Sequence, residues 1–195
     1  CFYCDFSIIP LGDSAETPGS PGMTSIKAYL DLLNKEILIS PRGPALSTIY
    51  LGGGTPSLLK KNELDNLLKN LQRKFGFQDG VEITMEVDPA TFCEKDLKGY
   101  IEIGINRLSL GGQSFDDRTL SSIGRKHNSS QLIEACNWVN KLFKEGMLRS
   151  WSLDLIQNLP ELNLYSWCKE LEQAVLSQAP HLSIYDLTIE PGTVF

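Results

Sequence analysis

The sequence predicts an α/β protein built on a parallel β-sheet. Short β-branched and aromatic runs, typical of strands, alternate along the 195 residues with longer segments whose apolar residues recur at helical spacing. Glycine or proline follows most of the strand-like runs. Such alternation is the pattern of repeated β-α-β units, which form either an open doubly wound sheet or a barrel-like sheet.

The amino-terminal half contains two predicted helices and two predicted strands. Apolar residues recur at helical spacing over 24–39 and again over 61–75, so both segments are predicted helices. The run 47–52 (STIYLG) is β-branched and aromatic and ends in glycine, and the run 81–87 (VEITMEV) stops at Asp88. Both runs are therefore predicted strands.

The carboxyl-terminal half continues the alternation. Further helices are predicted over 94–102, 130–143 and 164–177, because each has an apolar face. The remaining strands are predicted over 107–110, where a Gly111-Gly112 break ends the run, over 152–156 and over 181–188.

We expect residues 1–195 to be one core domain that is incomplete at both ends. The sequence opens on Cys1, without an initiator methionine, inside a motif that needs a strand to position it. A sixth strand is therefore expected before Cys1. The segment 11–22 (LGDSAETPGSPG) is rich in Gly, Ser and Pro, and it is expected to be a flexible surface loop.

The composition excludes several classes of protein. Hydrophobic residues make up 42% and charged residues 22% of the chain, which excludes a mainly disordered protein. The formal net charge of −6 argues against a nucleic-acid partner. No apolar run approaches the roughly 20 residues of a transmembrane helix. The five cysteines are spread too thinly for a disulfide scaffold and favour a reducing compartment.

Glycine and polar residues stand where the predicted strands end. The carboxyl ends of parallel strands meet at one edge of the sheet, where α/β proteins place their sites. The candidates at these ends include Gly53, Gly54, Thr55, Glu86, Gln113, Asp154 and Thr188. The glycine run either lets a ligand approach the backbone or makes a tight turn, and it lacks the Lys and Ser/Thr of a phosphate-binding loop.

Two cysteines stand close together, Cys1 and Cys4, in a C-x-x-C spacing. From the residues alone they are a redox pair, two zinc ligands or part of an iron–sulfur site. A zinc site usually has four ligands, and the sequence offers neither a second C-x-x-C nor a matching pair of histidines. The remaining cysteines and histidines are predicted to be structural: Cys93, Cys136, Cys168, His127 and His181.

Seven motifs occur in a fixed order along the chain. They are CFYCDF (1–6), GGGTPS (52–57), EVDP (86–89), GGQSF (111–115), GRKH (124–127), DLI (154–156) and EPGT (190–193). With them the chain resembles the radical S-adenosylmethionine (SAM) proteins of the oxygen-independent coproporphyrinogen oxidase group, and most of all their HemW-type branch, the haem chaperones. The resemblance covers nearly the whole chain. It implies a radical SAM partial (β/α)6 barrel whose first strand is missing from this chain.

The resemblance also implies cofactors. In the family, a C-x-x-x-C-x-x-C motif holds a [4Fe–4S] cluster by three thiolates, and SAM occupies the iron that they leave open. Cys1 and Cys4 match the second and third cysteines, so the first is expected four residues before Cys1. Haem is a further expected ligand, for which His127 is a weak candidate.

Site residues follow from the same resemblance. It places Gly53, Gly54 and Thr55 at the methionine end of SAM, Glu86, Gln113, Arg125 and Asp154 in the same pocket, Tyr3 near the adenine and Thr188 at a backbone contact. Arg125 is able to pair with the SAM carboxylate. From the local sequence alone, a helix cap remains an alternative role for Glu86, and a surface ion pair remains an alternative role for Arg125. Asp154 lies in an apolar strand, where carboxylates are rare without partners.

The expected function is that of a haem chaperone, which binds the cluster, SAM and haem and delivers haem to target proteins. Phe6 favours this branch, because the oxidases typically carry a cysteine there. Asn158 departs from the family, in which glycine is usual. The alternatives are an oxygen-independent coproporphyrinogen III oxidase, an oxidative decarboxylase of porphyrin biosynthesis, and a degenerate binding module without a cluster.

The resemblance leaves open whether the protein is an enzyme. The partners it implies are haem or a porphyrinogen, haem-accepting proteins, and a reductant of flavodoxin or ferredoxin type. The expected location is the cytoplasm or, in a eukaryote, the chloroplast or mitochondrion.

Overall fold

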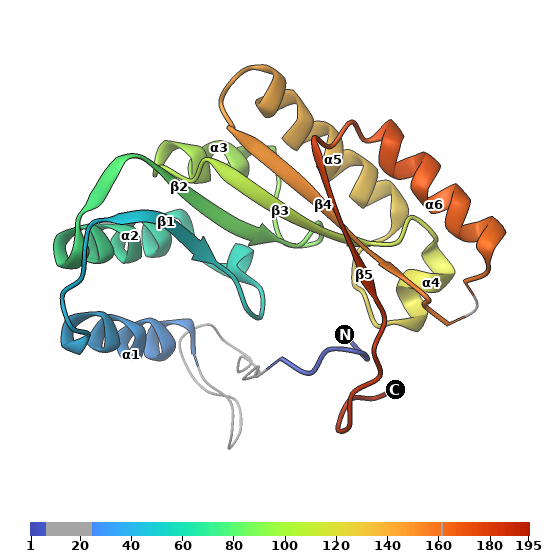
Figure 1. The fold of residues 1–195 in the computed structure, drawn as a ribbon, viewed down its shortest axis with the longest axis horizontal. Helices are drawn as coiled ribbons and strands as arrows, with labels where there is room; N and C mark the ends of the chain where they lie inside the picture. The colour runs from blue at the N-terminus through green and yellow to red at the C-terminus, as the bar shows by residue number, and fades with distance from the viewer. Residues whose placement is uncertain (7–24, 161) are drawn as a thin grey trace.

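The computed structural model describes residues 1–6, 25–160 and 162–195, so the predicted loop at 11–22 lies outside the described residues. Its centre is a five-stranded sheet in the order β1-β2-β3-β4-β5, with every neighbouring pair parallel. The strands are β1 (Leu46–Leu51), β2 (Phe77–Val87), β3 (Arg107–Gln113), β4 (Ser150–Gln157) and β5 (His181–Asp186). The curved sheet forms a half-barrel (Figure 1), which confirms the predicted α/β partial-barrel class.

Helices connect the strands. They are α1 (Ile26–Ile39), α2 (Lys61–Phe75), α3 (Glu94–Glu102), α4 (Asp117–Ser122), α5 (Ser129–Lys144) and α6 (Leu164–Leu176), and a 3₁₀ turn, η1, covers Pro56–Leu58. Figure 1 shows α3, α5 and α6 along one side of the sheet and both chain ends near the end of β5. Among the described residues, no helix has the length and apolar character needed to cross a membrane.

Most predicted elements are confirmed with their ends shifted by a residue or two. Strand β2 begins at Phe77, earlier than the predicted start at residue 81, and the prediction for the end of β3 is wrong. The expected break at Gly111-Gly112 does not exist, because β3 continues to Gln113. A Cβ atom at Gly112 would lie 2.8 Å from Leu153 and 3.1 Å from Leu132. Glycine is therefore required there for close packing under α5, and it does not stop the strand. The short α4 and the 3₁₀ turn were not predicted.

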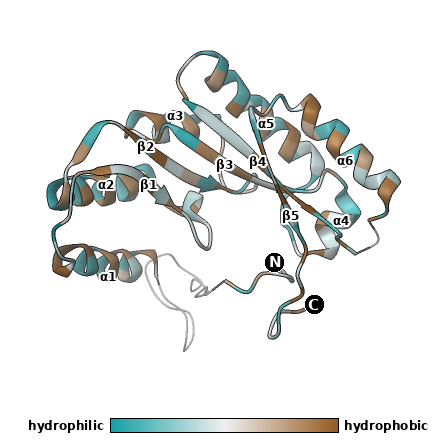
Figure 2. Cartoon of the chain, in the orientation of Figure 1, coloured by the Kyte–Doolittle hydropathy of each residue, from teal (hydrophilic) through white to brown (hydrophobic). Residues whose placement is uncertain are grey.

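One face of the sheet carries the hydrophobic core. Alternate strand residues point to this face and pack against α2, α3, α5 and α6. The core residues include Ile83, Met85, Leu108, Leu110, Trp151, Leu153, Leu64, Leu97 and Leu132. In Figure 2, α1, α2 and α6 each carry both hydrophobic and hydrophilic residues, as expected for helices with one face on a core.

The opposite face of the sheet is polar. Glu86, Ser109, Ser152 and Asp154 alternate with the core residues along β2, β3 and β4. The register aligns Glu86 with Ser109 and Ser109 with Ser152. A row of polar side chains therefore crosses the sheet on the side away from α3 and α5.

Candidate functional site

The glycine run after β1 lies against Glu86 of β2. The Glu86 carboxylate accepts hydrogen bonds from the Tyr50 hydroxyl (2.9 Å) and from the Gly53 N–H (3.2 Å). Gly53 has φ +112°, which favours glycine. Burial and the Glu86 hydrogen bond raise the pKa of Tyr50 to about 12. The alternative that Glu86 caps a helix is wrong, because the carboxylate that caps α3 is that of Asp96.

Arg125 lies between α4 and α5 and reaches the ends of two strands. Its Nη2 is 2.8 Å from the Asp88 carboxylate and donates to the Gly111 carbonyl at 2.7 Å. Its Nη1 lies 3.5 Å from the Cys1 sulfur. The Arg125 side chain is only 10% exposed, so the ion pair is largely buried and the surface alternative is wrong.

Asp88 follows β2 and anchors this arrangement. Its Oδ1 accepts from the Ala90 N–H at 3.0 Å, which leaves Oδ2 for Arg125. Burial raises the pKa of Asp88, but His127 and Arg125 outweigh burial, and the pKa lies below its ordinary value. Asp88 therefore stays ionised near neutral pH and offsets the charge of Arg125.

His127 is buried two residues after Arg125. Its Nε2 is 3.1 Å from the Gly112 carbonyl, and its Nδ1 is 3.7 Å from Asp88, which is too long for a hydrogen bond. Arg125 and His127 thus bind the carbonyls of two successive residues of β3. This arrangement makes His127 a structural residue of the strand end and places its ring away from any surface ligand.

Asp154 of β4 is a partly buried carboxylate. Its Oδ2 accepts from the Ser109 hydroxyl at 2.7 Å, but its Oδ1, which is buried, has no hydrogen-bond partner among the described residues. Burial raises the pKa of Asp154 and outweighs the lowering effect of the neighbouring Ser109 and Ser183 hydroxyls. An unpaired carboxylate oxygen in a buried place is costly, so a ligand donor would satisfy it.

The two predicted cluster cysteines lie in a segment that docks on the α4–α5 connection. The Phe2 N–H donates to the Ile123 carbonyl at 3.0 Å, and the Phe2 carbonyl accepts from the Val194 N–H at 2.9 Å. Tyr3 packs into a small cluster with Ile123 and Ile156, and burial raises its pKa. These contacts bring the Cys1–Cys4 segment to the same edge as Arg125.

The remaining predicted residues lie at or near this edge. Thr55 follows the glycine run, and its hydroxyl donates to the Gly54 carbonyl at 2.7 Å. Gln113 ends β3. Thr188 is exposed and lies two residues beyond β5, which ends earlier than predicted. Cys136 is buried, and burial raises the pKa of its thiol to about 12, as suits a structural cysteine.

Asn158 shows why a glycine is usual at its position. Its φ is +58°, a left-handed conformation that glycine adopts freely and asparagine tolerates. Its side-chain amide donates to Asp186 at 2.6 Å, which ties the end of β4 to the end of β5. Asparagine in place of the usual glycine is therefore accommodated at position 158 by these local features.

Sequence reasoning missed several polar partners at this edge. Asp88 was noticed only as a strand stop, and Tyr50 and Ser109 were not singled out. Asp88 lies within the EVDP motif and Ser109 lies two residues before the GGQSF motif, yet a motif does not say which distant side chain its residues bind. Only the fold pairs Asp88 with Arg125 and Ser109 with Asp154.

Comparison with known proteins gives the family. The model of the Radical SAM superfamily matches residues 1–163. This chain belongs to the radical SAM superfamily. The predicted membership is thereby confirmed, and the superfamily implies a [4Fe–4S] cluster and SAM as cofactors.

The relatives of this radical SAM chain include haem chaperones. It is 39% identical over 197 residues to the haem chaperone HemW of Synechocystis sp. and 37% identical over 198 residues to HemW of Haemophilus influenzae. Both matches cover 100% of this chain but only 46% and 49% of the relatives. The chain therefore spans about half the length of the curated relatives it matches.

A solved structure also resembles this radical SAM chain along its whole length. Coproporphyrinogen III oxidase (HemN) from Escherichia coli, described as a radical SAM enzyme, superposes with a TM-score of 0.83 and 26% identity. The match covers 100% of this chain and 42% of HemN. The resemblance to the coproporphyrinogen oxidase group and its HemW-type branch is confirmed at this level.

The residues present fit SAM better than they fit a complete cluster. The unpaired oxygen of Asp154, the backbone at Gly53 and the amide of Gln113 offer polar atoms at one edge of the sheet. For the cluster, Cys1 and Cys4 supply two thiols, and the described residues contain no group of three or more metal-binding side chains. This chain by itself therefore supplies two of the three thiolates that the family uses.

Proposed function

We propose that the whole protein is a HemW-like haem chaperone with a radical SAM core. The observation that carries this proposal is the match of the entire chain to HemW haem chaperones at up to 39% identity. The polar residues at the carboxyl ends of the strands also support the proposal, because they are the residues expected to line a SAM pocket. Phe6 supports the chaperone over the oxidase, because the resemblance places a cysteine at that position in the oxidases.

SAM, when bound beside a reduced cluster, supplies radical chemistry through its reductive cleavage. In our proposal this chain binds and orients it. Asp154 and Glu86 accept hydrogen bonds from its amino and hydroxyl groups, and Gln113 contributes an amide. The guanidinium of Arg125, held by Asp88, faces its carboxylate.

The glycine run and the cysteine segment complete the proposed pocket. Gly53, Gly54 and Thr55 present backbone groups to the methionine end, and Tyr3 and the backbone at Thr188 lie toward the adenine. We propose that the first cysteine of the motif, four residues before Cys1, completes the cluster site of the whole protein. Cys1 and Cys4 are its other two ligands.

We infer that haem binds elsewhere than at His127. The His127 ring is completely buried and its Nε2 is engaged by the Gly112 carbonyl. An axial ligand must present a free nitrogen to the iron. The proposed partners are therefore haem, a haem-accepting protein and a reductant, with no residue of this chain assigned as the haem ligand.

The experiment uses the full-length protein, reconstituted anaerobically with iron and sulfide. Haem binding is followed by the Soret band, and coproporphyrinogen III with SAM and reductant is followed by chromatography. Haem binding without conversion of the porphyrinogen is the expected result. Absence of haem binding would refute the chaperone.

The second candidate function is oxygen-independent coproporphyrinogen III oxidation. The resemblance to HemN over the whole chain favours it. Conversion of coproporphyrinogen III to protoporphyrinogen IX in the same experiment would establish it and would show that Phe6 does not separate the two branches. A degenerate binding module would show neither cluster absorbance nor SAM binding in this experiment. Its upstream coding sequence would also lack the motif's first cysteine, which is expected four residues before Cys1.

The proposed compartment is the cytoplasm, or the chloroplast or mitochondrion if the source is eukaryotic. Cell fractionation with an antibody to the endogenous protein tests this location directly.

A further inference from the structure

Gln113 ends β3 in a strained backbone conformation. Its φ is +67°, and the Ser114 N–H donates to the Gly112 carbonyl at 2.9 Å, which closes a γ-turn around Gln113. A γ-turn with positive φ is rare, and it persists only where the surroundings hold it. The turn places the Gln113 side chain beside Gly111, where an added Cβ would lie 3.0 Å from the Gln113 Nε2.

A carboxylate on the outer side of the sheet holds the residues that follow this turn. Glu170 of α6 is 4% exposed. Its Oε1 accepts from the Ser114 hydroxyl at 2.7 Å and its Oε2 accepts from the Phe115 N–H at 2.6 Å. The Ser114 hydroxyl in turn accepts from the Asp116 N–H at 3.0 Å. Both oxygens of Glu170 are therefore bound to the two residues directly after Gln113.

The same contacts set the start of α4. Asp116 caps this helix, because its Oδ1 accepts from the Thr119 N–H at 2.8 Å. At the other end of α4, the Arg125 N–H donates to the Leu120 carbonyl at 2.9 Å. The segment held by Glu170 thus connects Gln113 to Arg125, two residues of the predicted SAM pocket.

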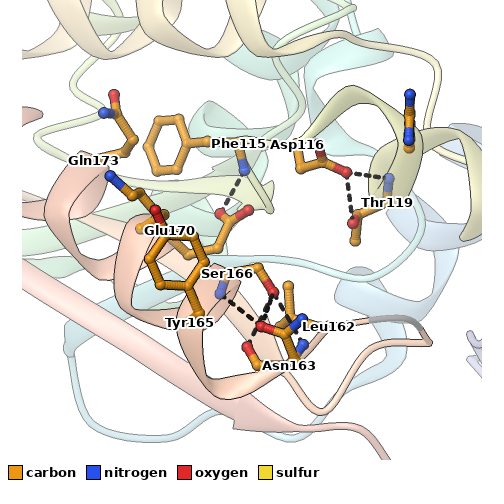
Figure 3. Close-up of a pocket in the computed structure, with 11 residues that line it drawn as sticks. Phe115, Asp116, Thr119, Leu162, Asn163, Tyr165, Ser166, Glu170 and Gln173 are labelled. Carbon is orange, nitrogen blue, oxygen red and sulfur yellow. Dashed lines mark hydrogen bonds between the residues drawn. The ribbon is translucent and has the colours of Figure 1, made fainter.

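An open groove runs beside this segment. Its volume is about 480 Å³, and Phe115, Leu162 and Tyr165 are among the residues that line it. Figure 3 shows Glu170 beneath Phe115, with the hydrogen bond from the Phe115 N–H crossing to the carboxylate. The Glu170 hydrogen bonds link α6 directly to the residues that follow the strand end.

We propose that Glu170 is a positioning residue, which holds the γ-turn at Gln113 and thereby fixes the Gln113 amide in the SAM pocket. The inference rests on the proposed function, in which Gln113 binds SAM. The desolvation of a buried carboxylate offsets part of what its hydrogen bonds contribute to stability. Burial indeed raises the pKa of Glu170 despite its hydrogen-bond donors.

The test begins without SAM. Hydrogen exchange of the amides at 112–118 is measured in the full-length protein for wild type, Glu170→Ala and Glu170→Gln. Glu172→Ala is the matched control, because Glu172 lies on the same helix with an exposed side chain. We expect faster exchange in Glu170→Ala alone. The Gln variant retains the turn, because its amide oxygen accepts from Phe115 and its NH₂ donates to Ser114.

The second readout is the dissociation constant for SAM, measured by equilibrium dialysis of the anaerobically reconstituted proteins. Glu170→Ala is expected to weaken SAM binding about tenfold, since small misplacements of a binding group are costly. Glu170→Gln restores the affinity. The double variant Glu170→Ala/Gln113→Ala binds no more weakly than Gln113→Ala alone, because both changes remove the same contact. If Glu170→Ala does not fold, Ser114→Ala removes one of the two Glu170 bonds, together with the acceptor of the Asp116 N–H, and gives a smaller loss of SAM affinity because the Phe115 bond remains.

Two results would overturn the inference. One is exchange at 112–118 in Glu170→Ala that equals that of wild type. The other is a loss of SAM affinity that adds fully to that of Gln113→Ala. Failure of the wild-type protein to bind SAM refutes the proposed function instead, and the exchange data then decide whether Glu170 holds the turn.

Discussion

Strand β4 separates two environments within a few residues. Trp151, Leu153 and Leu155 are completely buried against the helices. Ser152 and Asp154, which alternate with them, face the other side and join Ser109 in a hydrogen-bonded group. The helix-facing side is apolar apart from the Trp151 indole N–H, whereas the other side retains a carboxylate oxygen of Asp154; neither atom has a hydrogen-bond partner among the described residues. The contrast supports the proposal that stability and ligand binding are placed on opposite faces of one strand, and the variants below test that separation.

The largest expected effect is on the helix-facing side. Leu153→Ala should lower the free energy of unfolding by about 3 kcal/mol, because it removes buried apolar contacts and leaves a cavity. Urea unfolding measures the loss. Ser152→Ala is the matched control on the other face and should lose about 1 kcal/mol or less. Equal losses for the two variants would contradict the separation.

A smaller effect on the same side is expected from overpacking. Gly112→Ala should lower the free energy of unfolding by about 1–3 kcal/mol, because the new Cβ would lie 2.8 Å from Leu153. Gly43→Ala is the matched control, because a Cβ there would meet no atom within 4 Å. A Gly112→Ala protein as stable as wild type would show that Leu153 and Leu132 move aside freely.

On the polar face, Asp154→Asn should separate binding from stability. The free energy of unfolding should change by less than about 1 kcal/mol, because the amide keeps the Ser109 hydrogen bond and relieves a buried charge. Affinity for SAM should fall about tenfold, measured by equilibrium dialysis of the reconstituted full-length protein. A variant that binds SAM as wild type would remove Asp154 from the proposed pocket.

The two site carboxylates should give pH effects of opposite sign. The pKa of Asp88 is lowered from 3.8, so its stabilisation is present above 3.8 and is lost as the pH falls through the lower folded pKa. The pKa of Asp154 is raised from 3.8, so its contribution is present below 3.8 and is lost as the pH rises through the higher folded pKa. Unfolding of Asp88→Asn and Asp154→Asn across pH should show opposite slopes relative to wild type, and parallel slopes would contradict both assignments.

The smallest effect is expected at Asn158. Asn158→Gly relieves the left-handed backbone but loses the hydrogen bond to Asp186, so the free energy of unfolding should change by about 0.5 kcal/mol or less. Thermal unfolding measures the difference. A large destabilisation would mean that the Asp186 contact supports the end of the sheet.

The elements that were predicted well have apolar residues that repeat at regular spacing within the element itself. Helix α2 was predicted with its observed ends, because its leucines repeat at helical spacing. Helix α4 was missed, because its six residues have no such repeat and depend on Asp116 as a cap. Strand β3 was predicted too short, because the need for Gly112 comes from Leu132 and Leu153, which the local sequence does not show.

The residues of the candidate site likewise fall into two groups, those that the sequence could identify and those that only the fold reveals. Glu86, Gln113 and Asp154 could be found because parallel strands bring their ends to one edge, and Arg125 entered through a motif. Their partners could not be found. Asp88 and Arg125 are 37 positions apart in the chain, and Glu170 lies on a helix outside the sheet, with its contact at Phe115 55 positions away. Such pairings depend on the folded arrangement, and the roles of the predicted SAM residues stay predictions.

The docking of the cysteine segment has a consequence for the order of synthesis. The Phe2 carbonyl accepts hydrogen bonds from the N–H groups of Val194 and Phe195, and the Phe2 ring meets the Phe195 ring edge-on at 6.5 Å. The segment that carries Cys1 and Cys4 is thus supported in part by Val194 and Phe195. On a ribosome, the two cysteines emerge long before Val194 and Phe195 are synthesised. Iron bound to these thiols before residue 195 has left the exit tunnel would therefore be held by a segment that lacks its final contacts.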